Sequence, residues 1–242
     1  NALKEQGKTE EAIVAYSKAL TLRPDNYEAY NNLGNALMDK NKLEEAIDAF
    51  TKALTLKSDY FQAHVNLGNA LRDNGKEEEA LEAYHRSISI EPDYADAYFN
   101  IGLSLQRLEK FEESIDAYEK TLSLNPDHFL AYNNLGNVLR NYGKKECSIK
   151  AYEKAITLKP DYTEAISNLG VILKECDRFA EALEAFEKAL KIDQTYVEAY
   201  NNIGVTLKEQ GMSEKSIEAY KNALSIRPNY PEALNNMGIA LK

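Results

Sequence analysis

The side chains that most often carry catalysis or bind metals are few in this sequence and stand far apart. The three histidines are His64, His85 and His128, and the two cysteines are Cys147 and Cys176. Even the closest histidines, His64 and His85, are well separated, and no acidic residue or cysteine recurs beside them at metal-ligand spacing. No histidine is placed to serve as an oriented base for either cysteine. We therefore expect no catalytic, cofactor or metal site, and predict a protein that is not an enzyme.

One polar residue does recur at a fixed interval. An asparagine stands at every thirty-fourth position across most of the chain: Asn32, Asn66, Asn100, Asn134, Asn168, Asn202 and Asn236. Asparagine is a mediocre helix former, so its recurrence needs a reason beyond helicity. Its amide offers one acceptor and one donor group, which matches the backbone of an extended peptide without reading side chains. We predict that these residues bind a peptide; contacts between helices are the alternative explanation.

The same interval governs the residues that break regular structure. Seven of the 11 glycines share one position of the period, from Gly34 to Gly238, and the other four share a second position in alternate periods: Gly7, Gly75, Gly143 and Gly211. Five of the six prolines share another repeating position: Pro24, Pro92, Pro126, Pro160 and Pro228. Such regularity is typical of a repeat array and not of a single globular core.

Each period predicts two helices joined by a short turn. Apolar and small residues after Tyr27 follow the three-and-four spacing of an amphipathic helix: Ala29, Tyr30, Leu33, Gly34, Ala36 and Leu37. A second such helix follows, and Asn41 stands between them at the turn position that elsewhere holds glycine. We place partial repeats at 1–26 and 231–242 and six whole repeats between them: 27–60, 61–94, 95–128, 129–162, 163–196 and 197–230. Because no initiator Met is present, we expect a segment of a longer protein.

A 34-residue helix–turn–helix with Leu-Gly, alanine, an aromatic residue, alanine and proline at fixed positions resembles the tetratricopeptide repeat. The resemblance covers the whole chain, although the family's favoured tryptophan is absent. It implies an all-α solenoid, a right-handed superhelix of stacked antiparallel helix pairs. It also implies a concave groove that binds a peptide or protein. The repeats are similar in type to those of O-linked N-acetylglucosamine transferase, including junctions such as Pro92-Asp93-Tyr94.

Further residues on the same side of the first helices complete the predicted peptide site. Three asparagines share a second position: Asn35, Asn69 and Asn137. Basic residues form a line beside them, of which the first three are predicted site residues: Arg72, Arg140, Lys174, Lys208 and Lys242. Phe99 and Leu103, one helical turn apart, form either an anchor pocket for an apolar side chain of the partner or a contact with a neighbouring helix. The positions of Asn31 and Asn35 carry no Lys or Arg, which disfavours the carboxylate clamp of the family's chaperone adaptors.

Composition narrows the kinds of partner. The net charge is -10 and the pI is near 5.0, which argues against nucleic acid or an anionic membrane surface. No apolar run approaches the roughly 20 residues of a membrane span, and no signal peptide is visible. We expect a cytoplasmic interaction scaffold. Two alternatives stay open: a substrate-recruiting arm of an enzyme whose catalytic domain lies elsewhere, and self-assembly through exposed repeat ends such as Met237 and Leu241.

Overall fold

The computed structural model describes residues 8–242, and every regular element in this range is a helix. The chain divides into two compact units, residues 1–126 and 127–242, which we call unit 1 and unit 2. None of the described helices is long and apolar enough to cross a membrane.

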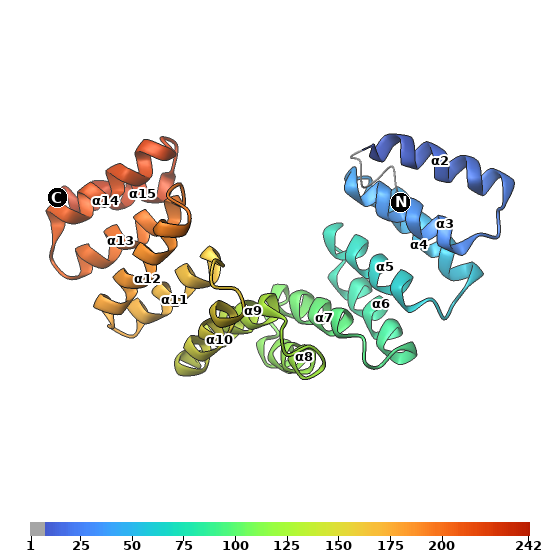
Figure 1. The fold of residues 1–242 in the computed structure, drawn as a ribbon, viewed down its shortest axis with the longest axis horizontal. Helices are drawn as coiled ribbons and strands as arrows, with labels where there is room; N and C mark the ends of the chain where they lie inside the picture. The colour runs from blue at the N-terminus through green and yellow to red at the C-terminus, as the bar shows by residue number, and fades with distance from the viewer. Residues whose placement is uncertain (1–7) are drawn as a thin grey trace. The chain divides into compact units, whose positions relative to one another are not determined.

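Both units are built from successive helices joined by short connections (Figure 1). Unit 1 contains α2 (Thr9–Leu22), α3 (Tyr27–Asp39), α4 (Leu43–Leu56), α5 (Phe61–Asp73), α6 (Glu77–Ile90), α7 (Ala95–Arg107) and α8 (Phe111–Leu124). Unit 2 contains α9 (Phe129–Asn141), α10 (Lys145–Leu158), α11 (Thr163–Glu175), α12 (Phe179–Ile192), α13 (Val197–Glu209), α14 (Ser213–Ile226) and α15 (Pro231–Ala240). The odd-numbered helices from α3 on are the first helices of their repeats, and the even-numbered ones are the second helices.

The two helices of a repeat pack along each other, as α3 does on α4 and α13 on α14 (Figure 1). Within each unit a second helix then contacts the first helix of the next repeat, for example α4 with α5 and α12 with α13. The predicted helical hairpins are therefore confirmed, and the chain is an all-α solenoid of stacked antiparallel helix pairs.

The recurring glycine of the first helix allows the second helix to approach closely. A Cβ atom added to Gly68 would lie 2.4 Å from Cε1 of Tyr84, and one added to Gly204 would lie 2.4 Å from Cε1 of Tyr220. Both rings are fully buried. Because no real Cβ tolerates such a distance in a close-packed interior, only glycine fits opposite the aromatic column.

The turn inside each hairpin has the left-handed backbone that its glycines suggest. In alternate repeats the turn residue is a glycine with φ near +80°: Gly75, Gly143 and Gly211. In the repeats between them it is another residue with φ of 57° to 59°: Asn41, Glu109 and Asp177. Gly7 lies outside the described residues. The turn residue therefore alternates between glycine and another residue along the array.

Candidate functional site

The recurring asparagines lie where the first helices of successive repeats meet. In unit 1 α5 contacts both α3 and α7, and in unit 2 α11 contacts α9 and α13 while α13 contacts α15. Asn100 is 9% exposed and the other six are half-buried. Within each unit, we call the surface formed by these residues and by the positions equivalent to Asn35 the asparagine face of that unit.

Three of the recurring asparagines are tied to the preceding repeat by the same hydrogen bond. In each case the Nδ2 amide donates to the Oδ1 atom of an asparagine 35 residues earlier: Asn66 to Asn31 at 2.9 Å, Asn168 to Asn133 at 3.1 Å, and Asn236 to Asn201 at 2.9 Å. The accepting asparagines are buried, and Asn133 is only 1% exposed. These bonds satisfy polar groups between first helices. For these three residues the structure favours contacts between helices.

Asn100 is also satisfied within the chain, by different partners. Its Oδ1 atom accepts a hydrogen bond from Nη1 of Arg72 at 2.6 Å, and its Nδ2 amide donates to the carbonyl of Asp96 at 2.8 Å. In the preceding repeat, Val65 occupies the position equivalent to Asn31 and offers no amide oxygen. The side chain of Asn100 is therefore held by an arginine of the preceding repeat. The three asparagines described above are held by an asparagine of the preceding repeat instead.

The remaining three recurring asparagines have free amides. The side chains of Asn32, Asn134 and Asn202 make no hydrogen bond to any described residue. For Asn202 the equivalent of Asn31 in the preceding repeat is Ser167, which has no amide oxygen. These half-buried amides keep a donor and an acceptor group available to a ligand.

The second asparagine position pairs with the buried aromatic column. The hydroxyl of Tyr84 donates to Oδ1 of Asn69 at 2.9 Å, and that of Tyr152 donates to Oδ1 of Asn137 at 2.7 Å. Burial raises the pKa of Tyr152 to about 12, so this hydroxyl remains a donor at neutral pH. The bond fixes the orientation of each amide and leaves its Nδ2 group free as a donor.

Two other repeats satisfy the same position without an asparagine. In one, Phe186 faces Val171, so neither side chain carries a polar group that needs a partner. In another, the hydroxyl of Tyr118 donates to Oε1 of Gln106 at 3.0 Å. In the Tyr118 repeat the position itself holds Leu103, and Gln106 accepts the hydrogen bond in place of an asparagine.

Two repeats are mismatched in opposite ways. Val205 stands in the repeat of Tyr220, whose hydroxyl is buried and makes no hydrogen bond to any described residue. Asn35 stands in the repeat of Phe50, which has no hydroxyl, so the Asn35 amide has no hydrogen-bond partner within residues 8–242. One mismatch leaves a polar group in the core, whereas the other leaves one on the asparagine face.

Three residues of the predicted basic line contact neighbouring carboxylates, whereas Lys208 forms no ion pair with any described residue. Nε of Arg140 lies 2.9 Å from Oε1 of Glu175, and Nζ of Lys174 lies 3.4 Å from Oε1 of Glu209. Each pair joins two successive repeats. Arg72 contacts the carboxylate of Asp73 at 3.4 Å in addition to Asn100. These three basic residues thus form part of a mixed, paired surface and do not create a strong positive field.

Phe99 and Leu103 are both half-buried. The ring of Phe99 lies 5.9 Å from the ring of Tyr118, in the second helix of the same repeat. This contact supports the packing explanation for Phe99.

The residues of possible catalytic interest stay dispersed. Nε2 of His64 lies 2.9 Å from the carbonyl oxygen of Ser58, Cys147 is exposed and Cys176 is half-buried. In the described part of the chain, no three His, Cys, Asp or Glu side chains gather as they would to hold a metal ion.

Sequence reasoning missed the buried asparagines that accept the bonds between repeats. The residue type at this repeat position varies along the chain. The position therefore did not stand out as invariant in the sequence. A signal was nonetheless present, because Asn31, Asn133 and Asn201 each precede a recurring asparagine by the same interval. At the far end of the array, Leu234 and Leu241 are exposed. Self-association through this end stays a prediction.

Comparisons with known proteins agree with this architecture. A family model described as a TPR repeat matches residues 1–40, 34–75, 68–109 and 172–211. Models described as the tetratricopeptide repeat match residues 95–128, 197–230 and 117–146. No curated protein sequence matches the chain.

Several solved structures share the fold. YrrB, described as a TPR protein with an unusual peptide-binding site, is 27% identical with a TM-score of 0.64, covering 78% of this chain and 97% of YrrB. A chain of the APC/C hetero-tetramer Cut9-Hcn1 is 19% identical with a TM-score of 0.77. That match covers 99% of this chain, which spans only 48% of the other. PilF of Pseudomonas aeruginosa is 17% identical with a TM-score of 0.75, covering 88% and 97% of the two chains.

The repeated helix pairs, the buried aromatic column facing glycine and the family models all lead to one assignment. The chain belongs to the tetratricopeptide repeat family.

Proposed function

We propose that the protein is a non-enzymatic scaffold that binds an extended segment of a protein partner along the asparagine face. The observation that carries this proposal is the set of free amides at Asn32, Asn134 and Asn202, which lie half-buried with no hydrogen-bond partner in the described chain. A partly buried amide costs free energy when neither water nor the protein fully satisfies its hydrogen bonds. A ligand backbone that pairs with the amide therefore gains binding free energy. YrrB, whose description includes a peptide-binding site, supports a ligand of this kind.

The surroundings of these amides favour a backbone ligand over a charged one. Asn69 and Asn137 each accept a bond from a buried tyrosine and present a fixed Nδ2 donor, which suits a peptide carbonyl. Arg140 and Lys174 are already paired with carboxylates of the next repeat. Recognition would therefore depend on hydrogen bonds to main-chain groups more than on charge.

The magnitude of such binding is modest. A neutral hydrogen bond contributes about 0.5–1.5 kcal/mol net, and ordering a flexible peptide consumes part of the total. Three free amides and the fixed donors then give affinities on the order of micromolar.

The test uses a display library of random short peptides selected on the immobilised chain. Selected peptides are titrated by fluorescence polarisation against the wild type and against a double variant, Asn134→Ala with Asn202→Ala. We expect a loss of about tenfold in affinity, which equals about 1.4 kcal/mol.

The matched control is the double variant Asn168→Ala with Asn236→Ala, whose amides already donate to the preceding repeat. We expect it to lower thermal stability and to change peptide affinity by less than threefold. Equal losses in both double variants, or no loss in the first while its helical circular dichroism is intact, would contradict the proposal. Failure to select any peptide would contradict it as well.

A further inference from the structure

A second set of cavities lies on the side of the first helices away from the asparagine face. Three of them are equivalent by repeat position and recur in every second repeat. Their apolar floors are Tyr30, Leu33 and Leu37 in the first, Tyr98, Ile101 and Leu105 in the second, and Ile166, Leu169 and Leu173 in the third. The first two belong to unit 1 and the third to unit 2. Their volumes are about 230, 480 and 370 Å³.

Helical geometry separates these cavities from the asparagine face. At about 100° per residue, Tyr98, Ile101 and Leu105 cluster on the wheel of α7 roughly opposite Asn100 and Leu103. A ligand in the second cavity and a peptide on the asparagine face would therefore contact opposite sides of the same helix.

The second cavity is the largest of the three, and its walls combine apolar side chains with the imidazole of His85. Leu81 and Ile88 line it from α6, and Ala117 lines it from α8, with α7 as the floor. The side chains of Leu81 and Ile88 are only half-buried, and the alanine keeps the wall of α8 low. The result is a groove between two second helices with room for bulky apolar side chains.

Charged residues border this groove in a fixed order. Along α8 and the turn before it the order is positive, negative, negative and positive: Lys110, Glu113, Asp116 and Lys120. The same order recurs at the other two cavities: Lys42, Glu45, Asp48 and Lys52, and Arg178, Glu181, Glu184 and Lys188. The repeat that follows the first cavity keeps this order with Lys76, Glu79, Glu82 and Arg86, whereas the repeats that follow the second and third cavities break it: Lys144, Cys147, Lys150 and Lys154, and Met212, Lys215, Glu218 and Asn222. All three cavities therefore have this charge order beside them.

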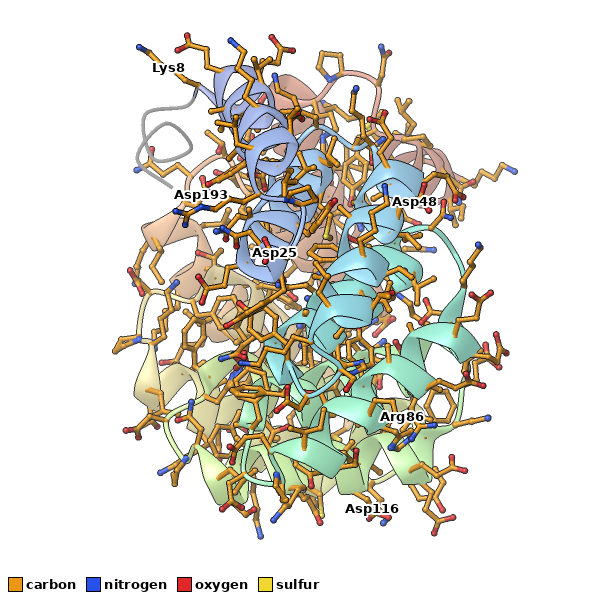
Figure 2. All side chains as sticks on the ribbon, turned by 90° about the vertical axis from the view of Figure 1, so that its right-hand side faces the viewer. Lys8, Asp25, Asp48, Arg86, Asp116 and Asp193 are labelled. Carbon is orange, nitrogen blue, oxygen red and sulfur yellow. The ribbon has the colours of Figure 1, made fainter. Side chains whose placement is uncertain are left out.

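At the second cavity these charges are unpaired. Lys110, Glu113 and Asp116 form no ion pair with any described residue, and Asp116 lies at the surface of unit 1 (Figure 2). Lys120 stands over the ring of Tyr98 at 5.7 Å. The groove therefore offers an apolar centre with free charges of both signs along one edge.

Because at the other two cavities Lys42 pairs with Glu45 and Arg178 pairs with Glu181, we propose that the groove of the second cavity docks an amphipathic helix of a partner protein. Its apolar face would enter the cavity, its basic residues would face Glu113 and Asp116, and its acidic residues would face Lys110 and Lys120. The four charges span about ten residues, or roughly 15 Å of helix. A helix keeps one face on the groove over that length, whereas an extended strand turns alternate side chains away from it. This surface does not depend on the function proposed for the asparagine face.

The test uses two synthetic helical peptides with the same leucine stripe and the same net charge. The matched peptide carries the order negative, positive, positive, negative, and the reversed peptide carries the opposite order. By isothermal titration calorimetry on the whole chain, we expect the matched peptide to bind at least tenfold more tightly. It should also leave the binding of peptides selected on the asparagine face unchanged.

A variant of the second cavity then tests the assignment to these residues. It combines K110E, E113K, D116K and K120E, all at exposed positions, so the net charge stays the same. We expect it to lose one equivalent of bound matched peptide and to gain one equivalent of reversed peptide, with unchanged circular dichroism. Equal affinity for both peptides, an unchanged stoichiometry in the variant, or competition with the peptides of the asparagine face would overturn the proposal. An unfolded variant is replaced by E113K with D116K, for which the loss of one matched equivalent is the decisive readout.

Discussion

Two repeats of unit 2, residues 129–162 and 197–230, have equivalent helices and an equivalent buried tyrosine. They differ at the first-helix position next to that tyrosine, which holds Asn137 in one repeat and Val205 in the other. In the first, Tyr152 donates its hydroxyl to Asn137 at 2.7 Å. In the second, Val205 takes the place of the asparagine, and the hydroxyl of Tyr220 is buried without a partner in the described chain. The difference shows that residues on the asparagine face also complete the core beneath them.

The rest of the array supports the same lesson. Phe186 occurs with Val171 and Tyr84 occurs with Asn69, whereas Tyr118 occurs with Leu103 and donates its hydroxyl to Gln106. An asparagine on this face is therefore not by itself evidence of a ligand. Asn35, above a phenylalanine, is the exception that keeps its amide free of the described residues.

The largest effect should come from the feature that both repeats share, the glycine opposite the tyrosine. A Cβ at Gly136 would lie 2.6 Å from the ring of Tyr152, and one at Gly204 would lie 2.4 Å from the ring of Tyr220. We expect Gly136→Ala and Gly204→Ala each to lower the free energy of unfolding by about 1–3 kcal/mol, because a buried ring cannot move aside without strain. Urea denaturation followed by circular dichroism measures the loss.

Gly238 provides the control for that pair. It holds the same repeat position, but no atom of the described chain lies within 4 Å of an added Cβ. Gly238→Ala should be neutral or stabilise by up to about 1 kcal/mol, since alanine favours a helix more than glycine does. Equal destabilisation at all three glycines would show that the ring contact is not the cause.

The next largest effect should come from removing the hydrogen-bond acceptor of Tyr152, so that its hydroxyl resembles that of Tyr220. Asn137→Val leaves the hydroxyl of Tyr152 buried without an acceptor, and we expect a loss of about 1–3 kcal/mol in the free energy of unfolding. Adding Tyr152→Phe should recover most of this loss, because it recreates the apolar pair of Phe186 and Val171. A double-mutant cycle from urea denaturation gives the coupling; additive effects would refute the pairing.

The smallest effect is expected in residues 197–230, from removing the unpaired hydroxyl of Tyr220. Tyr220→Phe removes a hydroxyl that has no partner among the described residues, so stability should stay within about 0.5 kcal/mol of the wild type or rise. Tyr152→Phe alone breaks a hydrogen bond and should cost about 0.5–1.5 kcal/mol. The two variants differ from the wild type by the same single oxygen atom and can be compared by thermal unfolding. A larger loss at Tyr220 would mean that its hydroxyl has a partner in solution.

Much of the fold could be predicted because local chemistry repeats at fixed spacing. The glycine column predicted close contact between helices, and the turn position of Asn41 predicted a left-handed residue, which its φ of 57° confirms. The candidate site was predictable only in outline. The recurring asparagines do lie on first helices, but the sequence marks the difference between Asn168, which donates to Asn133, and Asn202, which is free, only by the residue 35 positions earlier, and the structure was needed to give that residue its meaning. That distinction depends on contacts between residues of successive repeats.

The sequence by itself determined the repeat, its two helices, the turns and the aromatic and glycine columns, because each follows from helical periodicity and residue size within a single repeat. Only the tertiary structure decided which amides are already used, which tyrosine lacks an acceptor and where the apolar cavities open. These properties depend on distances between side chains of different helices, which a one-dimensional spacing does not fix. The free amides and the charged grooves are thus consequences of how neighbouring repeats pack.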